Sequence, residues 1–143
     1  MTRYRADDLT LLLPSFERKA RAVLAEMVAR GYDPVPFDTL RTPAEAAKLF
    51  ARGVGSANSM HCWGVACDVI CGAHGWDCAA HRCKFFQALG EVVEGLGLVW
   101  GGRWASRRDL VHFQGCTVAD QAAVRAIKDP VARDAFIAAR LCK

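Results

Sequence analysis

The chain has 143 residues, of which 52% are hydrophobic and 24% are charged. This length and apolar content suit one compact domain with its own core, so we expect a single domain over residues 1–143. No apolar run approaches the roughly 20 residues that a membrane-spanning helix needs, so we expect no membrane insertion. The net charge is +4 and no block of five like charges occurs, so we expect no nucleic-acid partner.

Helices and short strands alternate along the predicted chain. The sequence predicts helices over residues 14–30, 43–51 and 81–94 and from Thr117 and Asp129 onward, and extended segments over residues 34–40, 65–71, 98–100 and 110–114. Loops are expected over residues 53–60 and 72–78. The order α, β, α, β, α, β, β, α, α predicts an α+β domain built on a small sheet.

Local signals fix two of these elements. Thr42 is a good N-cap, Pro43 suits the first helical position and Glu45 completes a capping box, which places Arg41 immediately before a helix. The two prolines within residues 34–40 favour a strand at the edge of the sheet.

The segment from Ser59 to Asp68 reads SMHCWGVACD and contains the first candidate functional residues. His61 lies in a loop, and Asp68 follows seven residues later in an apolar segment. A carboxylate in such a segment is costly to bury unless it is paired or binds a metal. Taken alone, this pair is weak evidence for a metal site, because a hydrogen-bonded loop histidine and an aspartate that forms a cap or a salt bridge are the commoner case.

Residues 100–114, which read WGGRWASRRDLVHFQ, supply a second pair. Asp109 precedes His112 by three residues, where a loop rich in glycine and tryptophan enters a strand. Two imidazoles and one carboxylate suit a catalytic Zn²⁺ and leave a fourth position for water. A further carboxylate that does not bind the metal is the base that such a site needs.

The combined pattern Ser-x-His-x-x-Gly-x-Ala-x-Asp, Trp-Gly-Gly-x-Trp and Asp-x-x-His-Phe-Gln resembles the zinc L-alanyl-D-glutamate endopeptidases of phage endolysins. These form a superfamily with the D-alanyl-D-alanine carboxypeptidases and the vancomycin-resistance dipeptidases. The segment from Arg41 to Glu45 also resembles the family, so that the likeness spans roughly residues 10 to 115. It implies the D,D-peptidase/hedgehog type of fold, a small mainly antiparallel sheet flanked by helices, without a separate wall-binding domain.

The resemblance assigns the metal site and its base. It implies that His61, Asp68 and His112 bind Zn²⁺, and that Asp109 acts as the general base and then as the proton donor. The chain departs from the family at Val111, where a proline often stands. We expect this departure to loosen the approach to His112, because proline rigidifies the backbone.

The resemblance also implies an activity and a setting. Arg41, Ser59 and Trp104 are expected to bind the substrate, a peptidoglycan stem peptide, and Arg41 also to stabilise the developing oxyanion. The expected reaction is hydrolysis of the L-alanyl-D-glutamate bond by a monomer. A D-alanyl-D-alanine carboxypeptidase and a non-catalytic cell-wall-binding protein remain alternatives. Because no signal peptide is recognisable, we expect synthesis in the cytoplasm and action on the wall after holin-dependent release or from a virion.

The seven cysteines leave three possibilities open. An odd number without a signal peptide argues against a complete disulfide framework. Free thiols are therefore favoured over a disulfide between Cys71 and Cys78. The third possibility is a structural zinc site, drawn from a cluster that comprises Cys67, Cys71, Cys78 and Cys83 with His74 and His81 between them.

Overall fold

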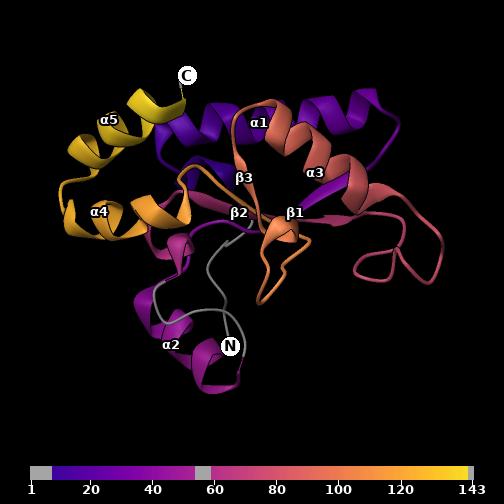
Figure 1. The fold of residues 1–143 in the computed structure, drawn as a ribbon, viewed down its shortest axis with the longest axis horizontal. Helices are drawn as coiled ribbons and strands as arrows, with labels where there is room; N and C mark the ends of the chain where they lie inside the picture. The colour runs from indigo at the N-terminus through magenta and orange to yellow at the C-terminus, as the bar shows by residue number, and fades with distance from the viewer. Residues whose placement is uncertain (1–7, 54–58, 142–143) are drawn as a thin grey trace.

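The structure, a computed structural model, describes residues 8–53 and 59–141, which form an α+β domain (Figure 1). The elements are, in order, α1 (Pro14–Ala29), β1 (Pro34–Asp38), α2 (Pro43–Ala51), β2 (Ala66–Cys71), α3 (Phe85–Gly95), β3 (Val99–Trp100), β4 (His112–Gln114), α4 (Gln121–Ala126) and α5 (Pro130–Leu141). Short 3₁₀ turns add η1 (Leu9–Leu11), η2 (Met60–Trp63), η3 (Gly101–Arg103) and η4 (Val118–Asp120). The predicted fold class and element order are confirmed.

The four strands pair in the order β1-β2-β4-β3, and every pair is antiparallel. The predicted edge position of β1 is confirmed. Its two prolines oppose Cys71 and Val69 of β2, and a register shift follows Pro36. A strand with prolines suits an edge because proline has no backbone N–H to offer a second neighbour.

The sheet has one face packed by helices and one face that carries polar side chains. In Figure 1, α1 and α3 lie above the sheet and α2 lies below it. Phe113 of β4 is fully buried, and its ring centroid lies 5.9 Å from that of Phe16 in α1. Because side chains alternate along a strand, His112 and Gln114 point to the opposite face. The core therefore lies on the α1 side, and the polar residues lie beneath it.

Two of the helix starts form as the sequence predicts. The Thr42 side chain accepts a hydrogen bond from the Glu45 N–H at the start of α2. Thr117 accepts in the same way from Asp120 before α4. Both caps satisfy a backbone donor that has no partner within the helix.

The third helix begins later than predicted, at Phe85 instead of residue 81. Residues 79–84 form turns, and Arg82 has a left-handed backbone with φ of +55°. An L-residue in that conformation cannot lie within a right-handed helix. The loop predicted over residues 72–78 therefore continues to residue 84.

Two further predicted segments are corrected or lie partly outside the described residues. The strand predicted over residues 110–114 is shorter, because the His112 N–H bonds to the Asp109 carbonyl in a turn. Residues 54–58 of the predicted loop over residues 53–60 lie outside the described part, and its last residue begins η2. In the described part, no helix is long and apolar enough to span a membrane.

Candidate metal centre

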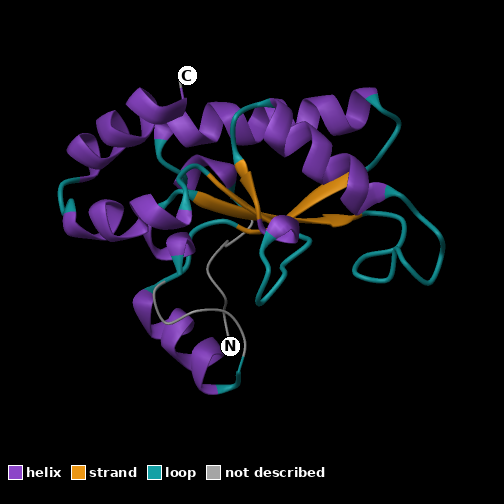
Figure 2. Ribbon diagram, in the orientation of Figure 1, coloured by secondary structure: helices purple, strands orange, loops and turns teal. Residues whose placement is uncertain are grey.

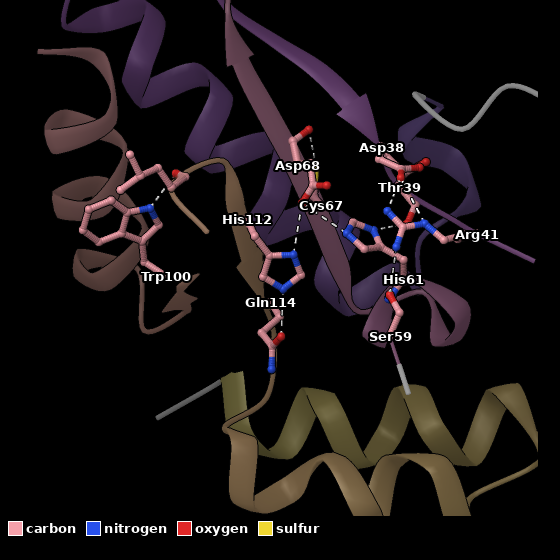
Figure 3. Close-up of polar contacts among 11 residues, drawn as sticks. Asp38, Thr39, Arg41, Ser59, His61, Cys67, Asp68, Trp100, His112 and Gln114 are labelled. Atoms are coloured by element: carbon pink, nitrogen blue, oxygen red, sulfur yellow. Dashed lines mark hydrogen bonds and ion pairs between the residues drawn. The ribbon is translucent and has the colours of Figure 1, made fainter. Parts of the chain in front are cut away.

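His61, Asp68 and His112 converge on the polar face of the sheet (Figure 3). Asp68 and His112 are directly opposed in the β2–β4 register, which puts their side chains on one face. His61 arrives from η2, where the Ser59 hydroxyl caps the turn by accepting from the His61 N–H. The potential ligand atoms of the three residues all lie within 4.8 Å of one another, and all three side chains are buried.

In each histidine, one ring nitrogen faces Asp68 and is called the inner nitrogen here. The other, outer nitrogen lies within hydrogen-bond distance of an acceptor. His61 Nδ1 lies 2.8 Å from the Thr39 carbonyl, which can only accept, so this nitrogen carries a proton. His112 Nε2 lies 2.8 Å from Gln114 Oε1. The Gln114 amide is oriented by its own N–H, which donates to the Cys116 carbonyl at 2.8 Å. The outer nitrogens are therefore donors in both rings.

The inner nitrogens of the neutral rings consequently present lone pairs toward a carboxylate. His61 Nε2 and His112 Nδ1 lie 3.1 and 3.0 Å from the same oxygen, Asp68 Oδ1. Three lone pairs at this range repel unless a proton or a cation lies between them. Ligands of a tetrahedral Zn²⁺ with bonds of about 2.1 Å stand about 3.4 Å apart. The donor set and its outer hydrogen bonds therefore fit zinc.

The charges at the centre are strongly coupled. Burial alone would raise the pKa of the Asp68 carboxyl, but the two imidazoles hold that pKa well below its ordinary value. Burial would lower the pKa of His112, but the hydrogen bond and charge of Asp68 raise it overall. Without a metal, His112 therefore holds its proton more tightly than a free imidazole, because the position beside the Asp68 carboxylate favours positive charge.

Asp109 stands beside the centre as a half-buried carboxylate. Burial raises the pKa of its carboxyl, and the nearby charge of Asp68 adds to the rise. The charges of His112 and His61 and the nearby Val111 N–H partly offset this rise in pKa. A carboxylate with a raised pKa accepts a proton more readily, which suits a base that must later return it.

The departure at Val111 does not leave the chain loose. The residue is buried, and its carbonyl accepts from the Val69 N–H at 2.9 Å. A proline would lack the N–H that here lies near Asp109. Val111 therefore ties the end of the loop to β2, and this contact opposes the expected loosening before His112.

Arg41 is buried next to the His61 segment and is held by an aspartate. Its guanidinium makes two hydrogen bonds to Asp38, one of them from Nε at 3.2 Å, and a third to the Ser59 hydroxyl at 3.3 Å. The Arg41 backbone N–H also donates to the His61 carbonyl at 3.0 Å. Arg41 and Ser59 thus share a hydrogen-bond network with the ligand segment (Figure 3).

The two tryptophans of the Trp-Gly-Gly-x-Trp element have different places. The half-buried Trp104 ring lies against His112, with ring centroids 5.2 Å apart, so it borders the centre. Trp100 is further away, and its indole N–H donates to the Leu110 carbonyl at 2.8 Å. Trp100 therefore positions the chain that leads into β4.

Sequence reasoning missed three residues that support the centre. Gln114 was part of the Asp-x-x-His-Phe-Gln pattern, but its role depends on strand alternation that places it beside His112. Thr39 acts through its backbone carbonyl, which no side-chain pattern reveals. Asp38 could have been suggested by its three-residue spacing from Arg41, although that spacing is common in loops.

One comparison with known proteins matches the segment of the chain that contains most of these residues. Residues 52–115 match the family described as D-alanyl-D-alanine carboxypeptidase. That segment contains His61, Asp68, Asp109 and His112, whereas Arg41 lies before it. No curated protein matches the chain.

A solved structure extends the likeness to most of the chain. It is the L-Ala D-Glu endopeptidase ChiX of Serratia marcescens, which has 24% sequence identity and a TM-score of 0.61. The match covers 83% of this chain and 91% of that one. At this identity the likeness concerns the fold. The chain thus carries a segment similar to the D-alanyl-D-alanine carboxypeptidase family and shares its fold with an L-Ala D-Glu endopeptidase.

Proposed function

We propose that this chain is a zinc-dependent peptidase that hydrolyses a bond in the stem peptide of bacterial peptidoglycan. The single observation that carries the proposal is the convergence of His61, Asp68 and His112, with both outer imidazole nitrogens already donating to acceptors. Zinc bound there would act as a Lewis acid on the scissile carbonyl and make water more acidic.

Asp109 supplies the proton transfer in this proposal. Its carboxylate lies close enough to the centre for Asp68 and both histidines to influence its pKa, and it is not itself one of the converging ligands. It takes a proton from the attacking water and passes it to the leaving amine. The raised pKa of Asp109 favours the first of these transfers.

Arg41 and Trp104 shape the substrate side of the centre. Asp38 and Ser59 fix the Arg41 guanidinium beside the His61 segment, and a fixed cation loses little freedom when it meets a substrate carboxylate or an oxyanion. The Trp104 ring lies against His112 and offers an apolar wall. Ser59 acts mainly through His61 and Arg41 in this arrangement.

The activity is tested with two variants that separate metal binding from proton transfer. We expect Asp109→Asn to retain zinc and to lose cleavage of purified peptidoglycan by about 10²-fold or more, because the amide cannot accept the proton. We expect His61→Ala to lose the zinc held at this centre. Zinc content is measured on the purified proteins. Near-normal cleavage by Asp109→Asn would refute its assigned role.

Lysis assays separate the enzyme from a wall-binding protein with the same fold. An enzyme lowers the turbidity of bacterial cells whose outer layer has been opened chemically, and Asp109→Asn does not. A wall-binding protein would sediment with the cells without lowering turbidity. Equal sedimentation of wild type and Asp109→Asn with only the wild type lysing cells is the expected result.

The favoured bond is L-alanyl-D-glutamate, because the solved structure of similar fold is an L-Ala D-Glu endopeptidase. Cleavage of a terminal D-alanine is the second candidate, because the matched family is described as D-alanyl-D-alanine carboxypeptidase. Mass analysis of digested peptidoglycan distinguishes them. The first bond yields free tetra- or tripeptides without L-alanine, whereas the second yields a loss of single D-alanine residues.

We further propose that the protein acts in phage-type lysis, made in the cytoplasm and released to the wall. The mild positive charge of the chain would favour approach to an anionic wall. Expression inside bacteria is expected to be harmless until a membrane pore is opened, after which the cells lyse. Lysis without such a pore would contradict this setting and leave the proposed chemistry intact.

A further inference from the structure

The loop between β2 and α3 is long and is held mainly by hydrogen bonds of its own turns. Residues 72–84 contain no helix or strand beyond a bridge between Cys71 and Gly75, and the loop projects to the right in Figure 2. Its largest apolar side chain, Trp76, is 54% exposed. A loop of this length in a compact domain usually needs a function or a staple to remain ordered.

Three thiols meet where this loop begins and ends. The sulfur atoms of Cys71, Cys78 and Cys83 all lie within 4.8 Å of one another. Cys71 and Cys78 are 3% and 1% exposed, and Cys83 is half-buried. They come from the end of β2, the middle of the loop and its last turn, so the cluster links all parts of the loop.

Cys71 is arranged as a ligand by the backbone that follows it. Burial would raise the pKa of the Cys71 thiol, but the nearby backbone N–H groups of His74 and Ala73 lower it. The turn is closed by Gly75, which has φ of +56° and exchanges backbone hydrogen bonds with Cys71. Backbone N–H donors stabilise negative charge on sulfur, which is the form that binds metals. A Cβ at Gly75 would strain this left-handed turn.

A disulfide explains the cluster less well than a metal does. One bridge would use two of the sulfur atoms and leave the third within contact range without a covalent partner. In the described residues none of the cysteines is bridged. Cys67, which the sequence grouped with these residues, is not part of the cluster. It lies four residues before Cys71 along β2, about 13 Å away at the rise of a strand.

We propose that Cys71, Cys78 and Cys83 bind a structural Zn²⁺, and that His74 or His81 of the same loop turns toward the ion as the fourth ligand. This turn is needed because neither imidazole lies within 4.8 Å of all three sulfur atoms in the structure. Structural zinc sites are almost always four-coordinate, and three cysteines with one histidine is a common set. The two imidazoles stack with centroids 4.2 Å apart at the same loop. His74 follows Cys71 at the short spacing that zinc sites use. Binding displaces the three thiol protons.

Zinc content in a variant without the first centre tests the proposal independently of the proposed function. His61→Ala is expected to retain about one zinc ion per chain, bound by the thiols. Adding Cys78→Ser to His61→Ala is expected to remove it. A His61→Ala protein without zinc would overturn the proposal. If the wild type and His61→Ala each contained one zinc ion per chain, the result would support the thiol site. It would count against zinc binding by His61, Asp68 and His112, because the wild type should then contain two ions.

Cobalt substitution identifies the ligands directly. Co²⁺ in the His61→Ala protein is expected to show sulfur-to-cobalt charge-transfer absorption and the intense visible bands of tetrahedral geometry. The matched control is Cys116→Ser, because Cys116 is also a buried cysteine but lies outside the cluster. This control should keep the sulfur band, and Cys78→Ser should lose it while remaining folded by circular dichroism.

The fourth ligand and the role of the loop are tested by histidine variants and proteolysis. Either His74→Ala or His81→Ala is expected to alter the visible cobalt bands, and no change in either would refute the assigned imidazole. Zinc removal from the His61→Ala protein is expected to increase the rate at which a protease cleaves within residues 72–84 by at least tenfold. If zinc removal left the rate of proteolysis unchanged and cobalt gave no sulfur-to-cobalt absorption, the proposed thiol site would be overturned.

Discussion

At the scale of single residues, Gln114 decides which nitrogen of His112 faces the centre. Its amide oxygen accepts from His112 Nε2, and its amide N–H is held by the Cys116 carbonyl. The side chain is 1% exposed, so water cannot readily replace it. Outer partners of this kind fix the tautomer of a metal-binding histidine and raise its basicity.

Replacing Gln114 should therefore weaken zinc binding without removing a ligand. We expect Gln114→Leu to lower zinc affinity by about 10- to 100-fold, measured by competition with a chromogenic chelator. Gln114→Glu is the matched control, because its carboxylate can still accept from His112 Nε2. Equal affinity in the Leu variant and the wild type would show that Gln114 only fills space.

At the scale of elements, the helix α3 and the loop before β4 are joined by the Trp100 indole. A Cβ added at Gly90 in α3 would lie 2.4 to 2.7 Å from ring atoms of Trp100, and one at Gly102 would lie 2.2 to 2.5 Å from other atoms of the same ring. The ring thus lies between two glycines. Its N–H then holds the Leu110 carbonyl, two residues before His112.

Gly90→Ala is therefore expected to destabilise the protein by about 1–3 kcal/mol through overpacking, despite the better helix propensity of alanine. Gly95, at the end of the same helix, has nothing within 4 Å of an added Cβ and no positive φ. Gly95→Ala should be neutral or stabilising by up to about 1 kcal/mol. Denaturant unfolding measures both, and similar effects at the two positions would contradict the packing described.

The helix α1 shows how one element caps another. Leu13 at its N-cap makes no side-chain hydrogen bond, but Asp134 of α5 accepts from the Ser15 N–H at 3.0 Å and from the Ser15 hydroxyl. The carboxylate also lies at the positive end of the α1 dipole. A capping interaction that is absent from the local sequence is therefore supplied from more than a hundred residues away.

At the scale of the whole molecule, the stability of the protein without zinc should depend on pH through the centre. The pKa of His112 is raised in the folded state, so its contribution is complete below its unfolded pKa of about 6.5 and is lost as pH rises through the folded value. The pKa of Asp68 is lowered, so its contribution is present above about pH 3.9 and is lost as pH falls through the folded value.

Zinc-free protein should therefore melt at a lower temperature as pH rises from about 6 to about 8, because protons leave the position between the ligands. Zinc-loaded protein should show the opposite trend, because the metal competes with those protons and binds more tightly at higher pH. Thermal melts with and without zinc test both slopes. Parallel slopes in the two series would show that protons and metal do not share the site.

The sequence by itself determined the order of elements and the identity of the converging residues. The capping box at Thr42 and the prolines of β1 act within a few residues, so local rules located α2 and the edge strand correctly. His61, Asp68 and His112, which the motifs singled out, also converge in the structure, and Asp109 lies beside them. The start of α3 did not, because a left-handed Arg82 interrupts an otherwise helical pattern.

Only the tertiary structure decided which polar groups surround the centre and which cysteines meet. The β2–β4 register sets Asp68 opposite His112, and strand alternation then brings Gln114 to the second ring nitrogen. The path of the loop gathers three thiols and leaves Cys67 elsewhere. These pairings join residues that are distant in the chain. They depend on backbone carbonyls, register and loop path, and none of these is written in local residue patterns.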